Sequence, residues 1–153
     1  EIVGAGVTAS CSVGQDAGAA GILEAMKLAT KGQPPGGEKL GCILASANGS
    51  VKPDAGEGRA IAEFLGDADI PVTSIKPLVG ETVGASGALQ LAGALAILDG
   101  GLIPPMPNLS EPEAGLKLNL VVRRPLNRHV SRVLLNTIDP AGSVVALAVE
   151  AGK

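Results

Sequence analysis

Aromatic residues are almost absent from this sequence: Phe64 is the only one, and there is no Trp or Tyr. Proteins that bind nucleic acids need a basic surface, and many also need aromatic side chains on which bases stack. Here 12 Lys and Arg residues are outnumbered by 15 Asp and Glu residues, which gives a net charge of −3. The composition therefore argues against a nucleic-acid partner.

Histidine and cysteine are also scarce. The single histidine, His129, lies in a polar stretch beside Arg128 and is expected to be solvated surface. Cys11 and Cys42 do not have the spacing of zinc ligands, and Cys42 lies in the apolar run GCILASA, which suggests a small buried side chain. The glycines do not form a dinucleotide-binding fingerprint between a strand and a helix. We therefore expect no metal, nucleotide, flavin or other cofactor.

Long hydrophobic runs are missing too. The longest, around 85–98, is too short and too rich in glycine to cross a bilayer, so we expect no membrane insertion. The sequence does not begin with Met and opens inside an apolar run, EIVGAGVTAS, so we interpret it as a piece of a longer protein. Its 153 residues are enough for one domain with its own core, spanning 1–153.

The apolar residues that are present are mostly Ala, Val, Ile and Leu, and with 22 glycines they favour close-packed α/β layers. Asp16 and Asp54 are candidate N-caps of two helices. Hydrophobic periodicity predicts strands at 2–8, 40–47, 70–76, 116–122, 131–138 and 143–150, and helices at 17–30, 54–65 and 86–98. Three strand-helix pairs, followed by three strands of which the last two form a hairpin, predict an α/β fold with a mixed sheet of about five strands covered by helices.

The predicted helix at 86–98 is apolar almost all the way round, with Gln90 as its main polar residue. A helix of this kind must be covered on every face. One sheet covers one face, and the rest of this sequence offers no obvious cover for the other. A second layer from another part of the protein, or from a partner, would supply it.

The turn before that helix, within SIKPLVGETVGASG, has the layout of an active-site turn. Lys76 is followed four residues later by Gly80, then by Glu81 and two more glycines. The residue after Gly80 occupies the place of a catalytic acid or base. Glu81 is therefore the first candidate site residue, with Lys76 as its neighbour.

These residues carry a resemblance to a known family. The segment from DAGEGRAIAEFLGD through VTSIKPLVGETVGASG to ILDGGLIPPMPNLSEPE resembles the C-terminal half of β-ketoacyl-acyl-carrier-protein synthases, the condensing enzymes of the thiolase fold. The crossover IPPMPNLSEP looks like the family's IPPTINLE-P, and SRVLLNTIDPAGSVVALAVE looks like its closing hairpin. The resemblance covers nearly the whole chain and implies a thiolase-like half within a five-layered α-β-α-β-α architecture.

The resemblance also implies a reaction, the decarboxylative Claisen condensation of acyl and malonyl thioesters in fatty acid or polyketide biosynthesis. In active members, a cysteine of the N-terminal half, which is absent from this chain, accepts the acyl group. Two histidines of the C-terminal half then help to decarboxylate the malonyl group and stabilise the oxyanions. A lysine just before the second histidine supports the site.

Lys76 matches that lysine, but Glu81 stands in place of the second histidine. An ionised carboxylate cannot donate to a thioester oxygen, so an ion pair with Lys76 is expected. A glutamate of raised pKa acting as a general acid is the alternative. The first histidine belongs to an Ala-His-Gly-Thr turn, which here is ASANGSVKPD. Alignment on the glycine places Asn48 there, and ungapped alignment from Asp54 places Ser46 there.

Two further positions bear on the resemblance. Pro140 of DPAGSV stands at the gate of the acyl pocket, where the family has the phenylalanine of GFGGTN, and proline cannot swing like a phenyl ring. Cys11 in TASCSVG looks like the family nucleophile motif, but the nucleophile belongs to the other half. We do not expect Cys11 to be reactive.

Two functions remain open at this point. The first is a ketosynthase-like acyltransferase domain, inactive in isolation, with altered chemistry at Glu81 and Asn48. The second is a non-catalytic partner of an active ketosynthase, similar to a chain-length factor, whose version of the turn aligns with ASANGSVKPD without gaps. Both imply the same partners: an N-terminal half, a homo- or heterodimeric partner and an acyl carrier protein. Both also imply a cytoplasmic location.

Overall fold

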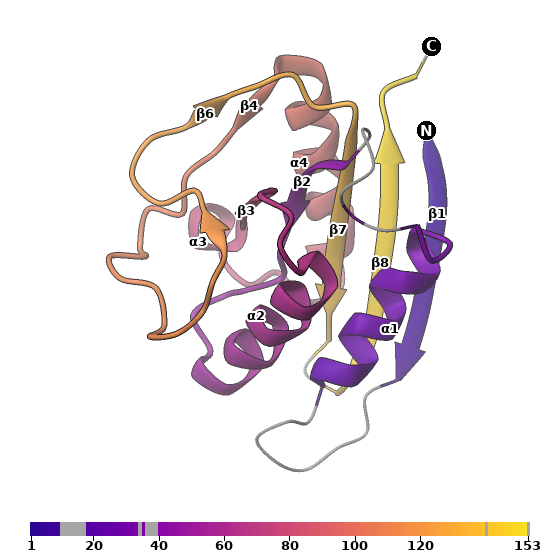
Figure 1. Ribbon diagram of the computed structural model, residues 1–153, viewed down its shortest axis with the longest axis vertical. Helices are drawn as coiled ribbons and strands as arrows, with labels where there is room; N and C mark the ends of the chain where they lie inside the picture. The colour runs from indigo at the N-terminus through magenta and orange to yellow at the C-terminus, as the bar shows by residue number, and fades with distance from the viewer. Residues whose placement is uncertain (10–17, 34, 36–39, 140, 153) are drawn as a thin grey trace.

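The computed structural model describes residues 1–9, 18–33, 35, 40–139 and 141–152 (Figure 1). Its elements form three layers, with one sheet between helices on either side. In chain order they are β1 (Ile2–Ala9), α1 (Ala19–Ala29), β2 (Leu40–Leu44), α2 (Val51–Leu65), β3 (Pro71–Thr73), α3 (Lys76–Val79), the 3-10 helix η1 (Val83–Ala85), α4 (Ser86–Gly100), β4 (Leu102–Ile103), β5 (Asn119–Leu120), β6 (Leu126–Asn127), β7 (Arg132–Ile138) and β8 (Ser143–Glu150).

The main sheet has the strand order β1-β8-β7-β2-β3-β5. The strands β7, β2, β3 and β5 run parallel to one another, whereas β8 pairs antiparallel with both β7 and β1. The central strand β2 is an unbroken small and apolar run, as expected of a strand buried on both faces. The sheet is therefore mixed, which confirms the predicted α/β fold class.

Two hydrophobic clusters pack on the opposite faces of the sheet. On one face, α1 and α2 bury Met26, Ile61 and Phe64 against alternate side chains of β2, β7 and β8. On the other face, α4 buries Ala94 and Ile97 in a second cluster with further side chains of β2 and β7. In Figure 1, α1 and α2 lie in front of the sheet and α4 lies behind it. The alternation of side chains along each strand thus supplies both cores.

Several predicted boundaries were wrong. The main sheet has six strands in the described part of the chain, and the expected strand at 116–122 contributes only the short β5 at its edge. The expected strand at 70–76 ends at Thr73, and Lys76 begins α3. The start of the crossover forms β4, which pairs with β6 in a separate ribbon. Short segments of this kind carry little periodicity, so their pairing depends on which backbone groups they meet in the fold.

Asp54 is not the N-cap of α2. The helix begins at Val51, and Ser50 stands at its N-cap position. Pro53 is accommodated in the first turn, where backbone N–H groups have no partner within the helix. The Asp54 carboxylate instead accepts hydrogen bonds from the backbone N–H groups of Asn48 and Gly49, at 3.2 and 2.7 Å. The other proposed N-cap, Asp16, lies outside the described residues.

One face of α4 is uncovered. Gln90, Ala94 and Ile97 face the sheet and are buried, whereas Ala92 and Leu95 are exposed, Leu95 to 48%. The prediction that this run is too short to cross a bilayer was wrong, because by length and composition the helical segment Val83–Gly100 could cross one, a property shared by core helices of globular folds. Absence of membrane insertion stays a prediction. The uncovered face is what the predicted second layer would cover.

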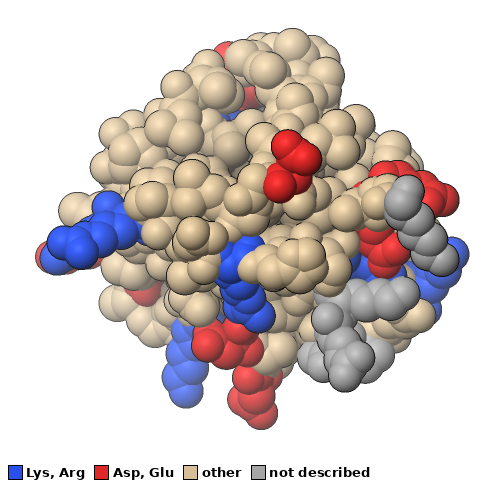
Figure 2. Space-filling model, turned by 90° about the horizontal axis from the view of Figure 1, so that it is seen from above, with Lys and Arg blue, Asp and Glu red and all other residues tan. Residues whose placement is uncertain are grey.

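Charge on the surface is mixed rather than segregated. In the view from above, Lys and Arg side chains are interspersed with Asp and Glu over one part of the face, and another broad part carries neither (Figure 2). This face has no continuous basic stripe of the kind that a nucleic acid would need.

Candidate functional site

The candidate site lies where the carboxyl ends of parallel strands meet. Asn48 follows β2, and Lys76 and Glu81 follow β3, which is the parallel neighbour of β2. The Ser74 hydroxyl donates a hydrogen bond of 2.7 Å to the Ala47 carbonyl oxygen and ties the two turns together. Three residues separated in the sequence are thereby brought to one edge of the sheet.

Lys76 and Glu81 form the ion pair that the sequence predicted. The Lys76 Nζ donates to Glu81 Oε2 at 2.8 Å. The lysine side chain is buried, whereas the glutamate side chain is 30% exposed. A buried ammonium requires a partner of opposite charge, because burial without one is costly. Glu81 supplies that charge to Lys76.

Glu81 is fixed by further donors. Asn48 Nδ2 donates to Oε2 at 2.8 Å, while the Ser86 hydroxyl and the Val83 backbone N–H donate to Oε1 at 2.7 and 3.1 Å. Hydrogen bonds from Lys76 first, and then from Ser86 and Asn48, lower the pKa of Glu81 to about 2. The alternative of a raised-pKa general acid was therefore wrong, because every bond made by this carboxylate favours its ionised form.

The backbone beside Glu81 is strained. Val83 has φ of 49°, a left-handed conformation that is rarely adopted by a β-branched residue. Its N–H is held by the Glu81 carboxylate, and Ser86 opens α4 directly after η1. Glu81 thus connects the turn after β2, α3, η1 and the first residue of α4.

The two alignments of the first histidine position are distinguished by geometry. Asn48 reaches Glu81 through its side-chain amide. Ser46 is buried, and its hydroxyl accepts a hydrogen bond of 3.1 Å from the Ile138 backbone N–H. Asn48 is therefore the residue that joins Lys76 and Glu81. A catalytic role for any of the three stays a prediction.

Sequence reasoning missed a buried polar cluster beneath the site. Glu57 Oε1 accepts hydrogen bonds from the Ser46 backbone N–H at 2.8 Å and from Asn136 Nδ2 at 3.0 Å. Gln90 Nε2 donates to the Asn136 carbonyl oxygen at 2.7 Å. Burial, as the largest cause, raises the pKa of Glu57 from 4.5 to about 7. A signal was available, since Glu57 precedes the apolar Ile61 of the predicted helix at 54–65 by four positions and so lies on the same helix face.

The remaining candidates do not join the site. Burial raises the pKa of the Cys42 thiol to about 12, consistent with a small core side chain. His129 is exposed and follows Arg128, whose N–H binds the Gly101 carbonyl oxygen at the C-terminal end of α4. Glu81 contacts the opposite end of that helix, about 20 Å away at 1.5 Å per residue. Cys11 and Pro140 lie outside the described residues.

A metal site is not apparent in the part of the chain that the structure describes, which has no group of three or more His, Cys, Asp or Glu residues placed to hold an ion. The donors around Glu81 are an ammonium, an amide, a hydroxyl and a backbone N–H. Because these groups satisfy the carboxylate, its oxygens are not available as ligands.

Solved structures share this fold. The ishigamide ketosynthase/chain length factor superposes with a TM-score of 0.89 at 24% identity, covering 99% of this chain and 38% of the other. A β-ketoacyl synthase from Burkholderia phymatum gives the same TM-score at 23% identity, covering 99% of this chain and 37% of the other. The chain therefore shares the fold of part of each of these two proteins.

Sequence comparisons agree with the fold. The family described as beta-ketoacyl synthase, C-terminal domain, matches residues 1–110. The chain therefore belongs to this family.

Relatives in this family include both subunits of one synthase. The tetracenomycin polyketide synthase ketoacyl synthase alpha subunit of Streptomyces glaucescens is 35% identical over 100 residues, which are 64% of this chain and 24% of the relative. The beta subunit is 30% identical over 129 residues, which are 84% of this chain and 32% of the relative. This chain thus spans a third or less of their length.

Proposed function

We propose that this chain provides the C-terminal half of a ketosynthase-fold protein that assists condensation without catalysing it, as a chain-length-factor-like partner. The observation that carries the proposal is the state of Glu81. It stands where the family resemblance places a histidine, and four donors hold it ionised. An ionised carboxylate repels an enolate and has no proton to give to a thioester oxygen.

The catalytic alternative rests on Asn48. Its Nδ2 carries two hydrogens, and Glu81 Oε2 is the acceptor for one of them. The second hydrogen could be donated to an oxyanion in a ketosynthase of altered mechanism. Similarity to both an alpha and a beta subunit of one polyketide synthase leaves room for either function. The electrostatic effect of Glu81 favours the non-catalytic one.

The proposed function requires partners. An N-terminal half would cover the exposed face of α4, and a homo- or heterodimeric ketosynthase partner would complete the acyl tunnel. An acyl carrier protein would deliver the chain. One structural relative is a ketosynthase solved with its type II polyketide acyl-carrier protein, which supports this choice of partner. A cytoplasmic location is part of this proposal, and the similarity to a polyketide synthase subunit supports it.

The test is acyl transfer to the full natural protein. It would be incubated with acyl-loaded carrier protein beside an active ketosynthase, and both would be weighed by intact-mass spectrometry. The proposal expects an acyl adduct on the ketosynthase and none on this protein. An adduct on this protein would instead reveal a live nucleophile and support the enzymatic alternative. Glu81→Gln would then show whether the carboxylate takes part in turnover.

A further inference from the structure

The turn between β2 and α2 contains an asparagine followed by a glycine. Asn48 is the only asparagine in the sequence that precedes a glycine, and both Asn48 and Gly49 are exposed. Because glycine has no side chain to shield its backbone nitrogen, that nitrogen can attack the side-chain amide carbon of the asparagine before it. The pair therefore has the composition of a site at which asparagine is deamidated.

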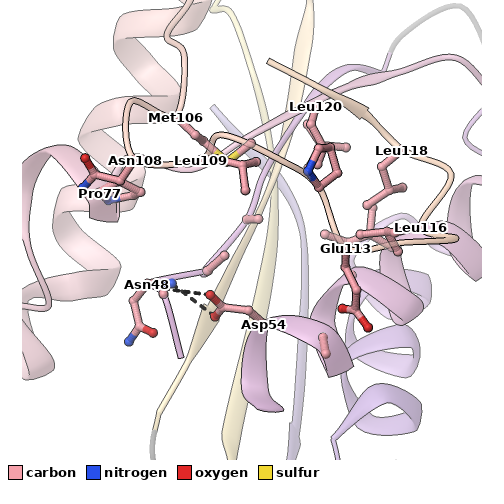
Figure 3. Close-up of a pocket in the computed structure, with 18 of the residues that line it drawn as sticks. Asn48, Asp54, Pro77, Met106, Asn108, Leu109, Glu113, Leu116, Leu118 and Leu120 are labelled. Carbon is pink, nitrogen blue, oxygen red and sulfur yellow. Dashed lines mark hydrogen bonds between the residues drawn. The ribbon is translucent and has the colours of Figure 1, made fainter. Parts of the chain in front are cut away.

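The attacking nitrogen lies against a carboxylate. The Gly49 N–H donates a hydrogen bond of 2.7 Å to Asp54 Oδ2, and the Asn48 N–H donates one of 3.2 Å to Oδ1. Figure 3 shows the Asp54 side chain pointing toward Asn48, with dashed lines for the hydrogen bonds to its oxygens. A carboxylate at hydrogen-bond distance from an N–H is placed to accept its proton as a general base. Asp54 can therefore make the Gly49 nitrogen a better nucleophile.

The side-chain carbonyl of Asn48 is polarised from the other side of Gly49. The Ser50 backbone N–H donates a hydrogen bond of 3.1 Å to Asn48 Oδ1. The ring that this contact closes contains Gly49, so it restrains the amide carbon, Cγ, close to the Gly49 nitrogen. The same N–H stabilises the negative charge that develops on Oδ1 during the attack. The turn thus holds a nucleophile, a base and an oxyanion donor around one carbon atom.

We propose that Asn48 is a deamidation site at which Asp54 assists the reaction. The Gly49 nitrogen gives its proton to Asp54 and forms a bond to Asn48 Cγ, while the bond from Cγ to Nδ2 breaks. The proton is returned through water to Nδ2, which leaves as ammonia, and a cyclic succinimide remains. A water molecule then opens the ring at either carbonyl carbon and gives aspartate or isoaspartate. The net change is amide plus water to acid plus ammonia, with no oxidation or reduction.

The reaction changes the charge beside the Lys76–Glu81 ion pair. Asn48 Nδ2 donates to Glu81 Oε2, the same oxygen that accepts from Lys76 Nζ. A carboxylate at position 48 cannot donate this bond, and it places a second negative charge next to Glu81. Deamidation therefore breaks the contact between the turn after β2 and Glu81. The inference goes beyond the proposed function and holds whether or not the protein takes part in condensation.

The test compares the full natural protein with a synthetic peptide of residues 45–52, which has the Asn-Gly pair without Asp54. Both are incubated at neutral pH, mass spectrometry of peptides measures the conversion of amide to acid, and isoaspartyl methyltransferase detects the isoaspartate. We expect Asn48 to react at least fivefold faster in the folded protein than in the peptide. Asn108 and Asn127 are also exposed and serve as internal controls that should stay intact. A smaller difference, or protection of Asn48 by the fold, would overturn the proposal.

A substitution of Asp54 tests its role as the base. Asp54→Asn keeps a hydrogen-bond acceptor but removes the base, so the rate in the folded variant should fall to that of the peptide. Asp67→Asn makes the same change at an exposed position beyond α2 and should leave the rate unchanged. An undiminished rate in folded Asp54→Asn would exclude Asp54 as the base. The comparison of the natural protein with the peptide decides the proposal even if this variant does not fold.

A second variant tests the effect of the product. Asn48→Asp reproduces one product and should unfold at a lower temperature than the parent protein at neutral pH, because it loses the bond to Glu81 and adds a like charge. Asn127→Asp, at an exposed position of β6, is the matched control and should unfold with the parent. Equal unfolding temperatures for the two variants would contradict the effect on the ion pair. The acyl-adduct experiment is independent of these outcomes.

Discussion

The Lys76 ammonium lies 2.8 Å from the Glu81 carboxylate and is buried, whereas Glu81 is partly exposed. The two residues depend on each other unequally. Lys76 relies on Glu81 to compensate its buried charge, whereas Glu81 also accepts hydrogen bonds from other donors. Substitution of Lys76 should therefore have different consequences from substitution of Glu81.

Glu81→Gln should destabilise the protein by about 2 kcal/mol, because it leaves the buried Lys76 charge without its anion. The partial exposure of Glu81 keeps the cost below that of a fully buried pair. Urea unfolding at neutral pH measures the change. Glu63→Gln, at an exposed position of α2, is the control and should be nearly neutral. Equal stability of the two variants would contradict the inferred role of the pair.

Acidification should reveal how much the ionised Glu81 contributes to the stability of the fold. Its pKa in the folded protein is about 2, below its ordinary value of 4.5. Such a group stabilises the fold above pH 4.5, and that stability is lost as the pH falls toward 2. Thermal unfolding between these pH values should show a smaller decline in Glu81→Gln than in the parent protein. A parallel decline in both would refute the assignment.

Glu57 should have the opposite dependence. Its pKa is raised from 4.5 to about 7, so the folded state holds the proton more tightly than the unfolded state does. The resulting stability is fully present below pH 4.5 and is lost as the pH rises through 7, with a total of about 3 kcal/mol. Glu57→Gln keeps a neutral acceptor and should flatten the stability profile in this window. A profile unchanged by the substitution would mean that Glu57 titrates normally.

Gly6 should not tolerate a side chain. A Cβ at this position of β1 would lie 2.0 Å from the Ala25 carbonyl oxygen of α1. Both atoms are held by the backbone, so no side-chain rotation can relieve the overlap. Gly6→Ala should therefore cost about 3 kcal/mol or prevent folding, since the helix must move away from the strand. Gly84→Ala meets no atom within 4 Å and serves as the control. Chemical denaturation of both variants measures the difference.

The exposed face of α4 should drive association of the 153-residue chain when it is produced alone. Ala92→Asp should shift the chain toward monomer, because it places a charge in the apolar contact. Ala20→Asp makes the same substitution at an exposed position of α1 and should not change the association. Sedimentation velocity over a concentration series distinguishes the species. A monomeric parent chain at high concentration would rule out this role of α4.

The sequence predicted the large elements well, for identifiable reasons. The helix at 86–98 appears as α4, extended by two residues to Gly100, because its apolar residues recur over several turns and Gly101 ends it in a left-handed conformation. The hairpin at 131–138 and 143–150 is β7 and β8, whose β-branched runs and tight turn specify it locally. Local patterns of this length determine element type without tertiary information.

The site was only partly predictable. The spacing of Lys76 and Glu81 pointed to their ion pair, since five residues across a glycine turn can bring the side chains together. The choice between Asn48 and Ser46 could not be made from the sequence, because it depends on how the turn after β2 faces the turn after β3. The Glu57–Asn136 contact joins residues 79 positions apart and has no local signature.

The sequence by itself determined the order of the principal helices and strands, the apolar character of α4 and the family, because these depend on composition, periodicity and motif. Tertiary structure alone decided the ionisation of Glu81 and Glu57. Glu81 lies in a turn among hydrogen-bond donors, which lower its pKa. Glu57 lies in a helix and is buried in the core, which raises its pKa. Charge state follows the three-dimensional surroundings of a side chain rather than its neighbours in the sequence.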